Sequence, residues 1–357
     1  MTEALSTGAG RRLRFALVGC GRIARNHVAA LAAHAERAEL VALCDKRPEA
    51  IQALVDHAPH LAEVPRFHSL AALLAGSQPN IVVLATPSGL HSRQAIEVAQ
   101  AGRHVLSEKP MATKWDEGMA MVRACREAGV KLFVVKQNRL NATLQLLKKA
   151  IDAGRFGRIA MVNVNVFWTR PQSYYDEAPW RGRWDMDGGA FMNQASHYVD
   201  MVDWLVGPVD NVHAYTATLG RDIEAEDTGV MSLRLRRGGL ASINVTMVTH
   251  GRNFEGSITV LGEKGTVRIG GVAVNEIQHW SFEDAQPEDE AVKAANYAPT
   301  SVYGYGHPLY YANVIDTLLG QASAEVDGYE GLRSLEVIIA AYRSARDGTR
   351  VGLPLVF

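Results

Sequence analysis

The spacing of hydrophobic residues changes once along the chain, near residue 158. Before that point, short runs of consecutive apolar residues alternate with longer segments in which apolar residues recur every three or four positions. Such runs are typical of strands buried on both faces of a parallel sheet, and such segments are typical of amphipathic helices. We therefore predict strands over residues 14–18, 40–44, 66–68, 80–85, 103–106 and 131–135, and helices over 23–31, 49–57, 70–75, 91–101 and 115–128.

After residue 158, runs of alternating apolar and polar residues predict strands with one buried face over 159–167, 209–219, 229–236, 240–248, 257–261 and 266–269. Glycine turns at 237–239 and 262–265 predict hairpins, and helical patterns cover 141–153, 309–319 and 331–345. We predict an α/β Rossmann domain over residues 1–137 and an α+β domain with a large, mainly antiparallel open sheet over 138–357. The last helices could pack back on the first domain.

Three stretches fall outside these patterns. Residues 172–187 are aromatic and charged, so we expect a functional loop there rather than a linker. The polar stretch 282–298 is expected to be a mobile excursion. Residues 1–12 lack the apolar segment of a secretory signal and are expected to form a polar leader.

A glycine pair follows the first apolar run. Gly19 permits a tight turn, Gly21 lets a pyrophosphate approach the backbone, and the small Ala24 lets the next helix pack on the strand. The free N–H groups at the start of that helix would face the anion. The second predicted strand ends in Asp45, where a ribose-binding carboxylate belongs. This order of elements predicts a dinucleotide site, and the acid favours NAD over NADP.

Composition narrows the range of partners. The net charge is −1 and there is no basic run, which argues against nucleic acid or an anionic membrane as a partner. No apolar stretch is long enough to cross a bilayer. The three cysteines (Cys20, Cys44 and Cys125) lack metal-ligand spacing and are predicted to be buried reduced thiols of a cytoplasmic protein. No metal site is predicted.

Two residues stand where oxidation chemistry would need them. Lys109 ends a predicted strand, and because Pro110 keeps it extended, we expect it to point into the ligand crevice of the sheet. The alternative is a solvated surface lysine. His197 is either a site residue or a core histidine bonded to a carbonyl. Oxidation of a secondary alcohol needs a hydride acceptor and a base, and burial beside a cationic nicotinamide favours the neutral, basic form of a lysine.

Arginines gather in and near the aromatic segment 168–183. Arg139, Arg170, Arg181 and Arg183 suit a substrate with a carboxylate and a diphosphate, because guanidinium groups bind both in a bidentate way. Each could instead belong to a solvated face or a subunit contact. The segment 303–310 opens a helix and could close over a sugar, although helix capping and core packing explain it nearly as well.

These motifs together resemble the Gfo/Idh/MocA oxidoreductase family along essentially the whole chain. The resemblance rests on residues 19–24, Ala85-Thr86-Pro87, Glu108-Lys109-Pro110, and Asp187-Gly188-Gly189 followed by His197 and Asp200. It implies a glucose–fructose oxidoreductase-like fold, a nicotinamide cofactor, and oxidation or reduction at a sugar or cyclitol carbon. It also implies that Lys109 and His197 are the catalytic residues. The implied NAD-binding residues are Gly19, Gly21, Arg22, Ile23, Asp45, Thr86, Pro87, Ser88, His91, Glu108, Lys109 and Gln137.

A closer similarity, carried by residues 135–141 and 168–182, is to the UDP-N-acetylglucosaminuronate 3-dehydrogenases of bacterial O-antigen synthesis. The sequence departs from the pattern of the wider Gfo/Idh/MocA family at one position, because Asn193 stands where the family usually has an aspartate. We expect Asn193 and His197, four residues apart, to share a helix face. Because an amide cannot stabilise an imidazolium as a carboxylate does, this departure favours Lys109 over His197 as the base. The implied substrate-binding residues are Lys109, Arg170, Tyr174, Arg181, Asn193, His197 and Tyr310.

The resemblance thus implies an NAD-dependent dehydrogenase of a nucleotide-sugar acid, acting at C3. Two alternatives stay open: a dehydrogenase of a free sugar or inositol, and a non-catalytic NAD-dependent sensor. Retention of both Lys109 and His197 argues against the sensor, and the charged aromatic segment 172–183 argues against inositol. We expect a cytoplasmic homodimer or homotetramer formed through the open sheet, with no membrane or nucleic-acid partner.

Overall fold

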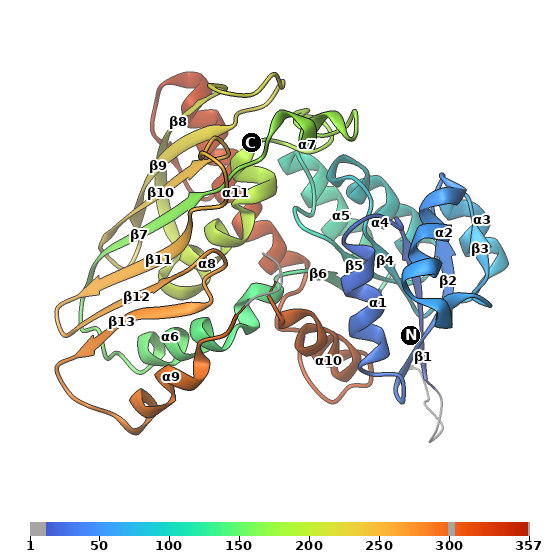
Figure 1. The fold of residues 1–357 in the computed structure, drawn as a ribbon, viewed down its shortest axis with the longest axis horizontal. Coiled ribbons are helices and arrows are strands. Elements are labelled where there is room, and N and C mark those ends of the chain that lie inside the picture. Colours follow the sequence, from blue (N-terminus) through green and yellow to red (C-terminus); the bar gives the residue numbers. More distant parts are fainter. Residues whose placement is uncertain (1–11, 299–303, 356–357) are drawn as a thin grey trace. The chain divides into compact units, whose positions relative to one another are not determined.

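The computed structural model describes residues 12–298 and 304–355. The chain divides into two compact units, one formed by Met1–Val135 with His307–Leu332 and the other by Lys136–Gly306 with Arg333–Phe357. Figure 1 colours the chain along its sequence and labels the elements of each unit. The predicted leader up to residue 11, and Tyr303 in the segment 303–310, lie outside the described residues.

The first unit is built on a six-stranded parallel sheet with the order β3-β2-β1-β4-β5-β6. Its strands are β1 (Leu13–Val18), β2 (Ala38–Cys44), β3 (Arg66–Phe67), β4 (Ile81–Leu84), β5 (His104–Ser107) and β6 (Leu132–Val134). Between them lie α1 (Ala24–Ala32), α2 (Pro48–His57), η1 (Pro59–Leu61), α3 (Leu70–Gly76), η2 (Ser88–Leu90), α4 (His91–Gln100) and α5 (Trp115–Glu127). This is the predicted Rossmann arrangement.

The strand order explains where a ligand binds in this unit. The consecutive apolar residues of β1 and β4 form the core, and Phe15, Leu17 and Val83 are completely buried. These two strands are neighbours, and the chain winds outward from them in opposite directions along the sheet. Sheets of this kind bind ligands outside the carboxyl ends of the strands at such a switch point. The loops that follow Val18 and Leu84 therefore flank the cofactor crevice.

Helical segments from late in the sequence complete the first unit. Most of α10 (Gly306–Leu318) and the beginning of α11 (Gly328–Asp347) belong to it. Phe133 of the edge strand β6 forms an isolated antiparallel bridge with Asp327 just before α11. This bridge covers part of a sheet edge whose backbone groups would otherwise lack partners.

The second unit is built on an eight-stranded sheet with the order β13-β12-β11-β7-β10-β9-β8-β14. Its strands are β7 (Ile159–Phe167), β8 (Val209–Ala217), β9 (Thr228–Leu235), β10 (Leu240–Thr246), β11 (Glu255–Gly262), β12 (Gly265–Gly270), β13 (Glu276–Phe282) and β14 (Val351–Gly352). Neighbouring strands are antiparallel except β7 and β10, which are parallel. The mainly antiparallel sheet predicted from the sequence is confirmed.

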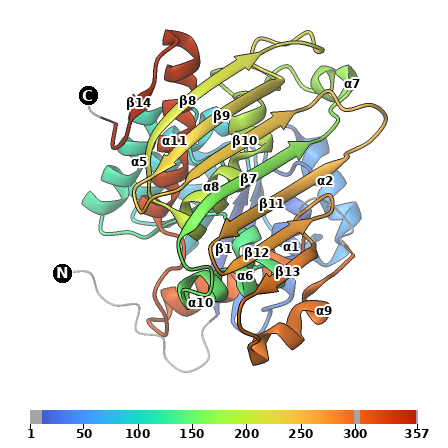
Figure 2. The same ribbon diagram turned by 90° about the vertical axis from the view of Figure 1, so that its left-hand side faces the viewer.

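The helical elements of the second unit are short apart from three helices. They are η3 (Gln137–Leu140), α6 (Ala142–Asp152), α7 (Gln172–Asp176), the π-helical turn η4 (Ala190–Gln194), α8 (Ser196–Val206), η5 (Pro287–Ala291), α9 (Val292–Ala295) and the remainder of α11. Figure 2 shows α8 behind the strands when this sheet is seen face-on. The strands alternate as predicted, so that Val164 is completely buried while Met161 on the same strand is 46% exposed.

The stretch 282–298 differs from its prediction. It forms two helical elements that were not predicted, η5 and α9, and β13 just before it was not predicted either. Arg155 donates two hydrogen bonds, of 2.7 and 2.9 Å, to the carboxylate of Asp289, and the indole of Trp280 donates a third. Polar composition concealed this element because its stabilising contacts are ion pairs and side-chain hydrogen bonds rather than an apolar face.

Candidate functional site

The glycine loop of the first unit fits the backbone of a phosphate-binding turn. Gly19 has φ +95°, and a Cβ placed on it would lie 2.5 Å from the carbonyl oxygen of Ala85. Gly21, in contrast, has no neighbouring atom within 4 Å of such a Cβ, so the space beside it is open. Ala24 is completely buried at the start of α1, where it packs on the sheet. A larger residue at 19 would separate the two loops that flank the crevice.

Asp45 follows β2 and holds the glycine loop in place. One carboxylate oxygen accepts a hydrogen bond from the Cys20 amide (2.9 Å) and the other accepts one from the Arg47 amide (2.9 Å). A carboxylate has about four acceptor positions, so two are left for ribose hydroxyls. Arg22 is exposed and Ile23 half-buried in the same loop. The residues present therefore fit a dinucleotide whose adenosine ribose lies against Asp45.

The loop after β4 is connected to the Glu-Lys-Pro segment by one histidine. Nε2 of His91 lies 2.8 Å from the carbonyl oxygen of Thr86, and its Nδ1 lies 2.9 Å from that of Pro110. Burial lowers the pKa of His91. Both ring nitrogens thus face backbone oxygens, which gives His91 a positioning role between the two loops. Pro87 is half-buried and Ser88 is buried in this loop.

Glu108 points into the first unit rather than toward solvent. Its Oε1 lies 3.1 Å from Nε2 of His27, and its Oε2 accepts a hydrogen bond from the Lys109 amide. Nδ1 of His27 lies 2.8 Å from the hydroxyl of Tyr311 on α10. Burial raises the pKa of Glu108, but the contacts with His27 and His307 outweigh burial and hold it well below its usual range. This buried network fixes the backbone of Lys109, which is half-buried and precedes a cis Lys109–Pro110 bond.

In the second unit, the structure brings together predicted substrate residues around Tyr174 of α7. The guanidinium of Arg170 lies 5.5 Å from the centroid of the Tyr174 ring, and that of Arg181 lies 4.2 Å from it. Gln194 of η4 accepts a hydrogen bond from Arg170 Nε (3.1 Å) and donates one to the Tyr174 hydroxyl (3.3 Å). Arg181 also pairs with Glu177 at 2.6 Å.

Asn193 and His197 lie in two different helical elements rather than in one helix. Asn193 lies in the π-helical turn η4 and His197 in α8, and Ala195 separates the two elements. The single helix expected from the sequence is therefore interrupted between them. The Asn193 amide donates a hydrogen bond to Asp187, whose other oxygen accepts one from the Gly182 amide at 2.8 Å. His197 is 8% exposed at the start of α8.

The predicted substrate arginine Arg139 has a different role. Its Nε and Nη2 donate hydrogen bonds of 2.8 and 2.7 Å to the two oxygens of Asp200, one turn after His197 on α8. Lys136 lies 3.6 Å from the same carboxylate and donates a hydrogen bond to Ser334 at 2.7 Å. Burial raises the pKa of Asp200, but the charges of Lys136 and Arg139 outweigh burial and lower it to about 2. Arg139 therefore anchors α8.

Two further predicted site residues are buried. Tyr310 is 1% exposed in α10, and its hydroxyl donates a hydrogen bond of 2.7 Å to the carbonyl oxygen of Val134. The sequence did not predict this hydrogen bond, since a tyrosine near the start of an amphipathic helix has the same sequence pattern whether it packs in the core or binds a ligand. Gln137 is 2% exposed in η3 and belongs to the second unit.

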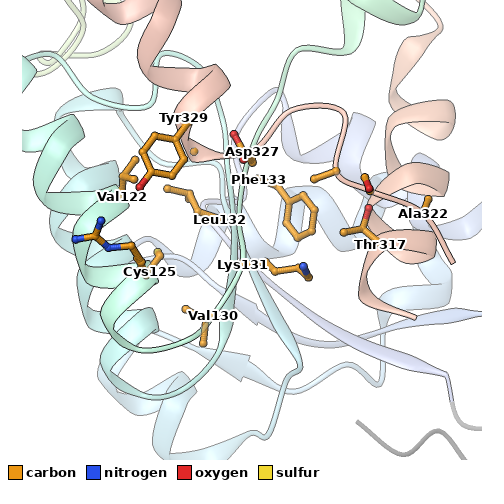
Figure 3. Close-up of a pocket in the computed structure, with 14 residues that line it drawn as sticks. Val122, Cys125, Val130, Lys131, Leu132, Phe133, Thr317, Ala322, Asp327 and Tyr329 are labelled. Carbon is orange, nitrogen blue, oxygen red and sulfur yellow. The ribbon is translucent and has the colours of Figure 1, made fainter. Parts of the chain in front are cut away.

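Figure 3 shows a cavity of about 460 Å³ in the first unit. It is bounded by α5, β6 and the start of α11, with Val122, Leu132 and Tyr329 in its lining. Val130 and Lys131 place it near the amino end of β6, whereas the cofactor loops follow the carboxyl ends of the strands. None of the predicted site residues lines it.

Cys20, Cys44 and Cys125 are free and buried. Over residues 12–298 and 304–355, no cluster of three or more His, Cys, Asp or Glu side chains is placed to hold a metal ion. The helices described in these ranges are also too short or too polar to cross a membrane.

Two family models match the chain, one over each of its two main parts. Residues 13–136 match the model GFO_IDH_MocA, described as oxidoreductase family, NAD-binding Rossmann fold. Residues 148–353 match the companion model, described as oxidoreductase family, C-terminal alpha/beta domain.

Two crystal structures are similar to the chain over nearly its whole length. The WlbA dehydrogenase from Bordetella pertussis, in complex with NADH and UDP-GlcNAcA, is 65% identical with a TM-score of 0.93, covering 97% of this chain and 99% of that one. The WlbA dehydrogenase from Chromobacterium violaceum, in complex with the same two ligands, is 60% identical with a TM-score of 0.92, covering 98% of each. A levoglucosan dehydrogenase from Pseudarthrobacter phenanthrenivorans is 26% identical, and the match spans 64% of each chain, just under two thirds of that enzyme's length.

Proposed function

Because the chain belongs to the Gfo/Idh/MocA family of oxidoreductases, we propose that it is an NAD-dependent dehydrogenase of UDP-N-acetylglucosaminuronic acid. The reaction oxidises the C3 hydroxyl of the sugar to the 3-keto compound. The observation that carries this proposal is the similarity, along almost the whole chain, to dehydrogenases whose crystal structures hold NADH and UDP-GlcNAcA.

The first unit supplies the cofactor residues in this proposal. The open backbone at Gly21 and the start of α1 would hold the pyrophosphate, and the remaining acceptor positions of Asp45 would hold the ribose. The Thr86–Ser88 loop closes the same crevice, while His91 keeps that loop in place. When bound, NAD supplies the acceptor for the hydride.

We assign the proton transfer to Lys109. Its position directly after β5 is fixed by the buried Glu108 and His27, so its side chain starts from a rigid backbone. A positioned base of this kind accepts the proton of the C3 hydroxyl as the hydride leaves the same carbon. His197, in the other compact unit, is proposed to orient that hydroxyl. The anchoring of α8 through Asp200 supports this role.

The Tyr174 cluster supports a nucleotide-sugar acid as the substrate. Arg170 makes hydrogen bonds to Thr169 and Asn253 through one nitrogen and to Gln194 through another, which holds its guanidinium plane in one orientation. A fixed guanidinium binds a carboxylate or phosphate at a smaller entropic cost than a freely rotating one. Tyr174, Arg181 and Asn193 lie around it and are proposed to complete the substrate contacts.

Two other functions stay open beside this one. A dehydrogenase of a free sugar or inositol would use the same cofactor residues but would have no anion for Arg170. A non-catalytic NAD-dependent sensor would bind the dinucleotide without turnover. The rigid Lys109 backbone and the buried anchors of the His197 helix favour an enzyme over a sensor, since a sensor has no use for a positioned base.

We further propose that the enzyme acts in the cytoplasm, in the synthesis of bacterial O-antigen, and as a homodimer or homotetramer. The uncovered face of the second sheet supports self-association, because Tyr215, Val230 and Leu240 are 66%, 45% and 52% exposed there. Figure 2 looks onto this sheet. Light scattering of the full chain tests this, and a mass equal to one chain would contradict it.

The test of the proposed function uses purified protein with NAD and UDP-N-acetylglucosaminuronic acid. Formation of reduced nicotinamide is followed by absorbance, and the 3-keto product is identified by mass spectrometry after deuteride reduction. Oxidation at another carbon would disprove the assigned position, and no oxidation of the acid would disprove the substrate.

A further inference from the structure

A buried carboxyl group lies beneath the turn that leads to His197. Glu226, just before β9, is 2% exposed. A methyl group placed on Gly189 would overlap its carboxyl group, so the second glycine of the Gly188-Gly189 pair leaves the space that Glu226 fills. The mechanism proposed above gives Glu226 no part, and no ion pair in the described part of the chain includes it.

Glu226 and Tyr342 together satisfy three consecutive backbone amides at the start of η4. The Glu226 carbonyl accepts a hydrogen bond from the Ala190 amide (2.9 Å), and Oε1 of its side chain accepts one from the Phe191 amide (2.9 Å). The Tyr342 hydroxyl accepts one from the Met192 amide (3.1 Å) and donates one to the same Oε1 (2.8 Å). The first amides of a helical segment have no partner within it, so these two residues act as its cap.

The far end of this turn carries predicted site residues. Asn193 and Gln194 are the last residues of η4, and α8 with His197 begins two positions later. Gln194 in turn contacts Arg170 and Tyr174. Any change in the conformation of η4 therefore moves both the Asn193 amide and the start of the His197 helix.

We propose that Glu226 is a positioning residue for the reaction, which with Tyr342 fixes η4 and so sets the places of Asn193 and His197. The proposal rests on the proposed function for its kinetic consequence. Its structural part, that the carboxyl group holds the amides of 190–192, stands independently of any substrate.

The charge state of the group follows from what surrounds it. The titratable side chains that face Glu226 are Tyr342 of α11 and Asp187 before η4, and neither is a cation. Its Oε2 is buried without a hydrogen-bond partner, which is costly for a charged carboxylate. Burial, aided by the Asp187 charge, raises the pKa of Glu226 to about 7. The group thus binds a proton more tightly in the folded chain than in the unfolded one.

The test compares Glu226→Ala, Glu226→Gln and the matched control Glu224→Ala in the full chain. Glu224 is exposed two residues earlier in the same segment. In Glu226→Ala we expect hydrogen–deuterium exchange at residues 190–194 to speed up at least about tenfold, because the cap is lost. We expect kcat/KM for UDP-N-acetylglucosaminuronic acid to fall about 10–100-fold, while the Kd of NAD changes less than about twofold because NAD binds the other unit. Glu226→Gln, which keeps the acceptor oxygen, should restore both.

Unchanged exchange at 190–194 in Glu226→Ala would overturn the proposal, as would kcat/KM within twofold of the wild type. If Glu226→Ala does not fold, Tyr342→Phe removes the link to Met192 while Glu226 remains, and the same two readouts apply. A wild type that leaves the acid unoxidised would overturn the proposed function alone, since the exchange measurement needs no substrate.

The pH dependence of the unfolding midpoint supplies a further check on the charge of Glu226. Because the folded pKa of Glu226 is raised to about 7 from an unfolded value of about 4.3, the wild type should lose stability relative to Glu226→Gln as pH rises from about 4 to 7, and a constant difference over that range would contradict the buried neutral carboxyl.

Discussion

At the residue scale, Asp45 shows how one carboxylate can support a loop and still select a ligand. Two of its acceptor positions hold the amides of Cys20 and Arg47. The remaining positions suit ribose hydroxyls, and the negative charge repels a 2′-phosphate. We expect NAD to bind at least about tenfold more tightly than NADP. Fluorescence titration measures both dissociation constants, and equal or tighter NADP binding would show that Lys46 and Arg47 dominate the charge of this site.

We assign the proton transfer to Lys109, and we expect its neighbours Glu108 and His27 to fix its position without taking part in the transfer. Lys109→Met removes the base and leaves the Glu108–His27 network intact, so turnover should fall about 10²–10⁴-fold with little loss of NAD affinity. His197→Asn should cost less, because we assign the histidine an orienting role. Single-turnover hydride transfer measures both variants. Near-normal hydride transfer in Lys109→Met would show that another residue is the base.

Substitution of Arg170 tests whether the substrate is an anion. Arg170→Ala should raise the KM for the acid about 10–100-fold and change kcat much less, because the lost contact binds the ground state and the transition state alike. Arg158→Ala is the matched control, since Arg158 is exposed and pairs with the exposed Glu263. Steady-state kinetics with the acid give KM and kcat for both variants. Equal effects of the two substitutions would remove Arg170 from the substrate site.

At the scale of elements, α8 is anchored by two carboxylates one turn apart. Asp200 binds Arg139, and Asp203 accepts a hydrogen bond of 2.7 Å from Arg333 of α11. Both carboxylates are buried, so their pairing with the two arginines fixes the position of α8 along and around its own axis. The position of His197 depends on these anchors as much as on its own contacts.

Asp200→Asn should therefore destabilise the chain by about 3–5 kcal/mol, because it leaves the charges of Lys136 and Arg139 buried without a carboxylate. The exposed pair of Arg346 and Asp347 supplies the control, where Asp347→Asn should leave the urea midpoint nearly unchanged because solvent screens the pair. The folded pKa of Asp200 is depressed to about 2. Its contribution is therefore present above pH ~4 and lost as pH falls toward 2. Urea unfolding measures both variants, and equal midpoints would show that the buried cluster contributes nothing.

The elements were largely predictable from the sequence, and the failures have local causes. Most strands of both sheets follow from apolar periodicity, since burial on one face or two leaves a direct pattern, whereas β13 and β14 were not predicted. The π-helical turn that contains Asn193 was not predicted, because its amides bind Glu226 and Tyr342, which are distant in sequence. The hydrogen bonds of Arg139 with Asp200 and of Tyr310 with Val134 were not predicted, because composition does not reveal which buried partner a side chain has.

At the scale of the whole molecule, the chain passes three times between its compact units. Residues 307–332 return to the first unit, where Tyr311 of α10 meets the buried His27–Glu108 network. The remainder of α11 belongs to the second unit and supplies Tyr342 to the cap of η4. The last part of the sequence therefore supports both the backbone of Lys109 and the turn before His197, so a truncation there should affect both halves of the chemistry.

The central claim is that this enzyme oxidises a UDP-linked uronic acid with NAD. The most direct measurement is a burst assay that offers UDP-N-acetylglucosaminuronic acid, its uncharged parent UDP-N-acetylglucosamine, and myo-inositol separately, each with NAD, and records reduced-nicotinamide absorbance. We expect the fastest reduction with the acid, because only the acid offers a carboxylate as well as a diphosphate to the arginines around Tyr174. Faster reduction with UDP-N-acetylglucosamine or with inositol would contradict it.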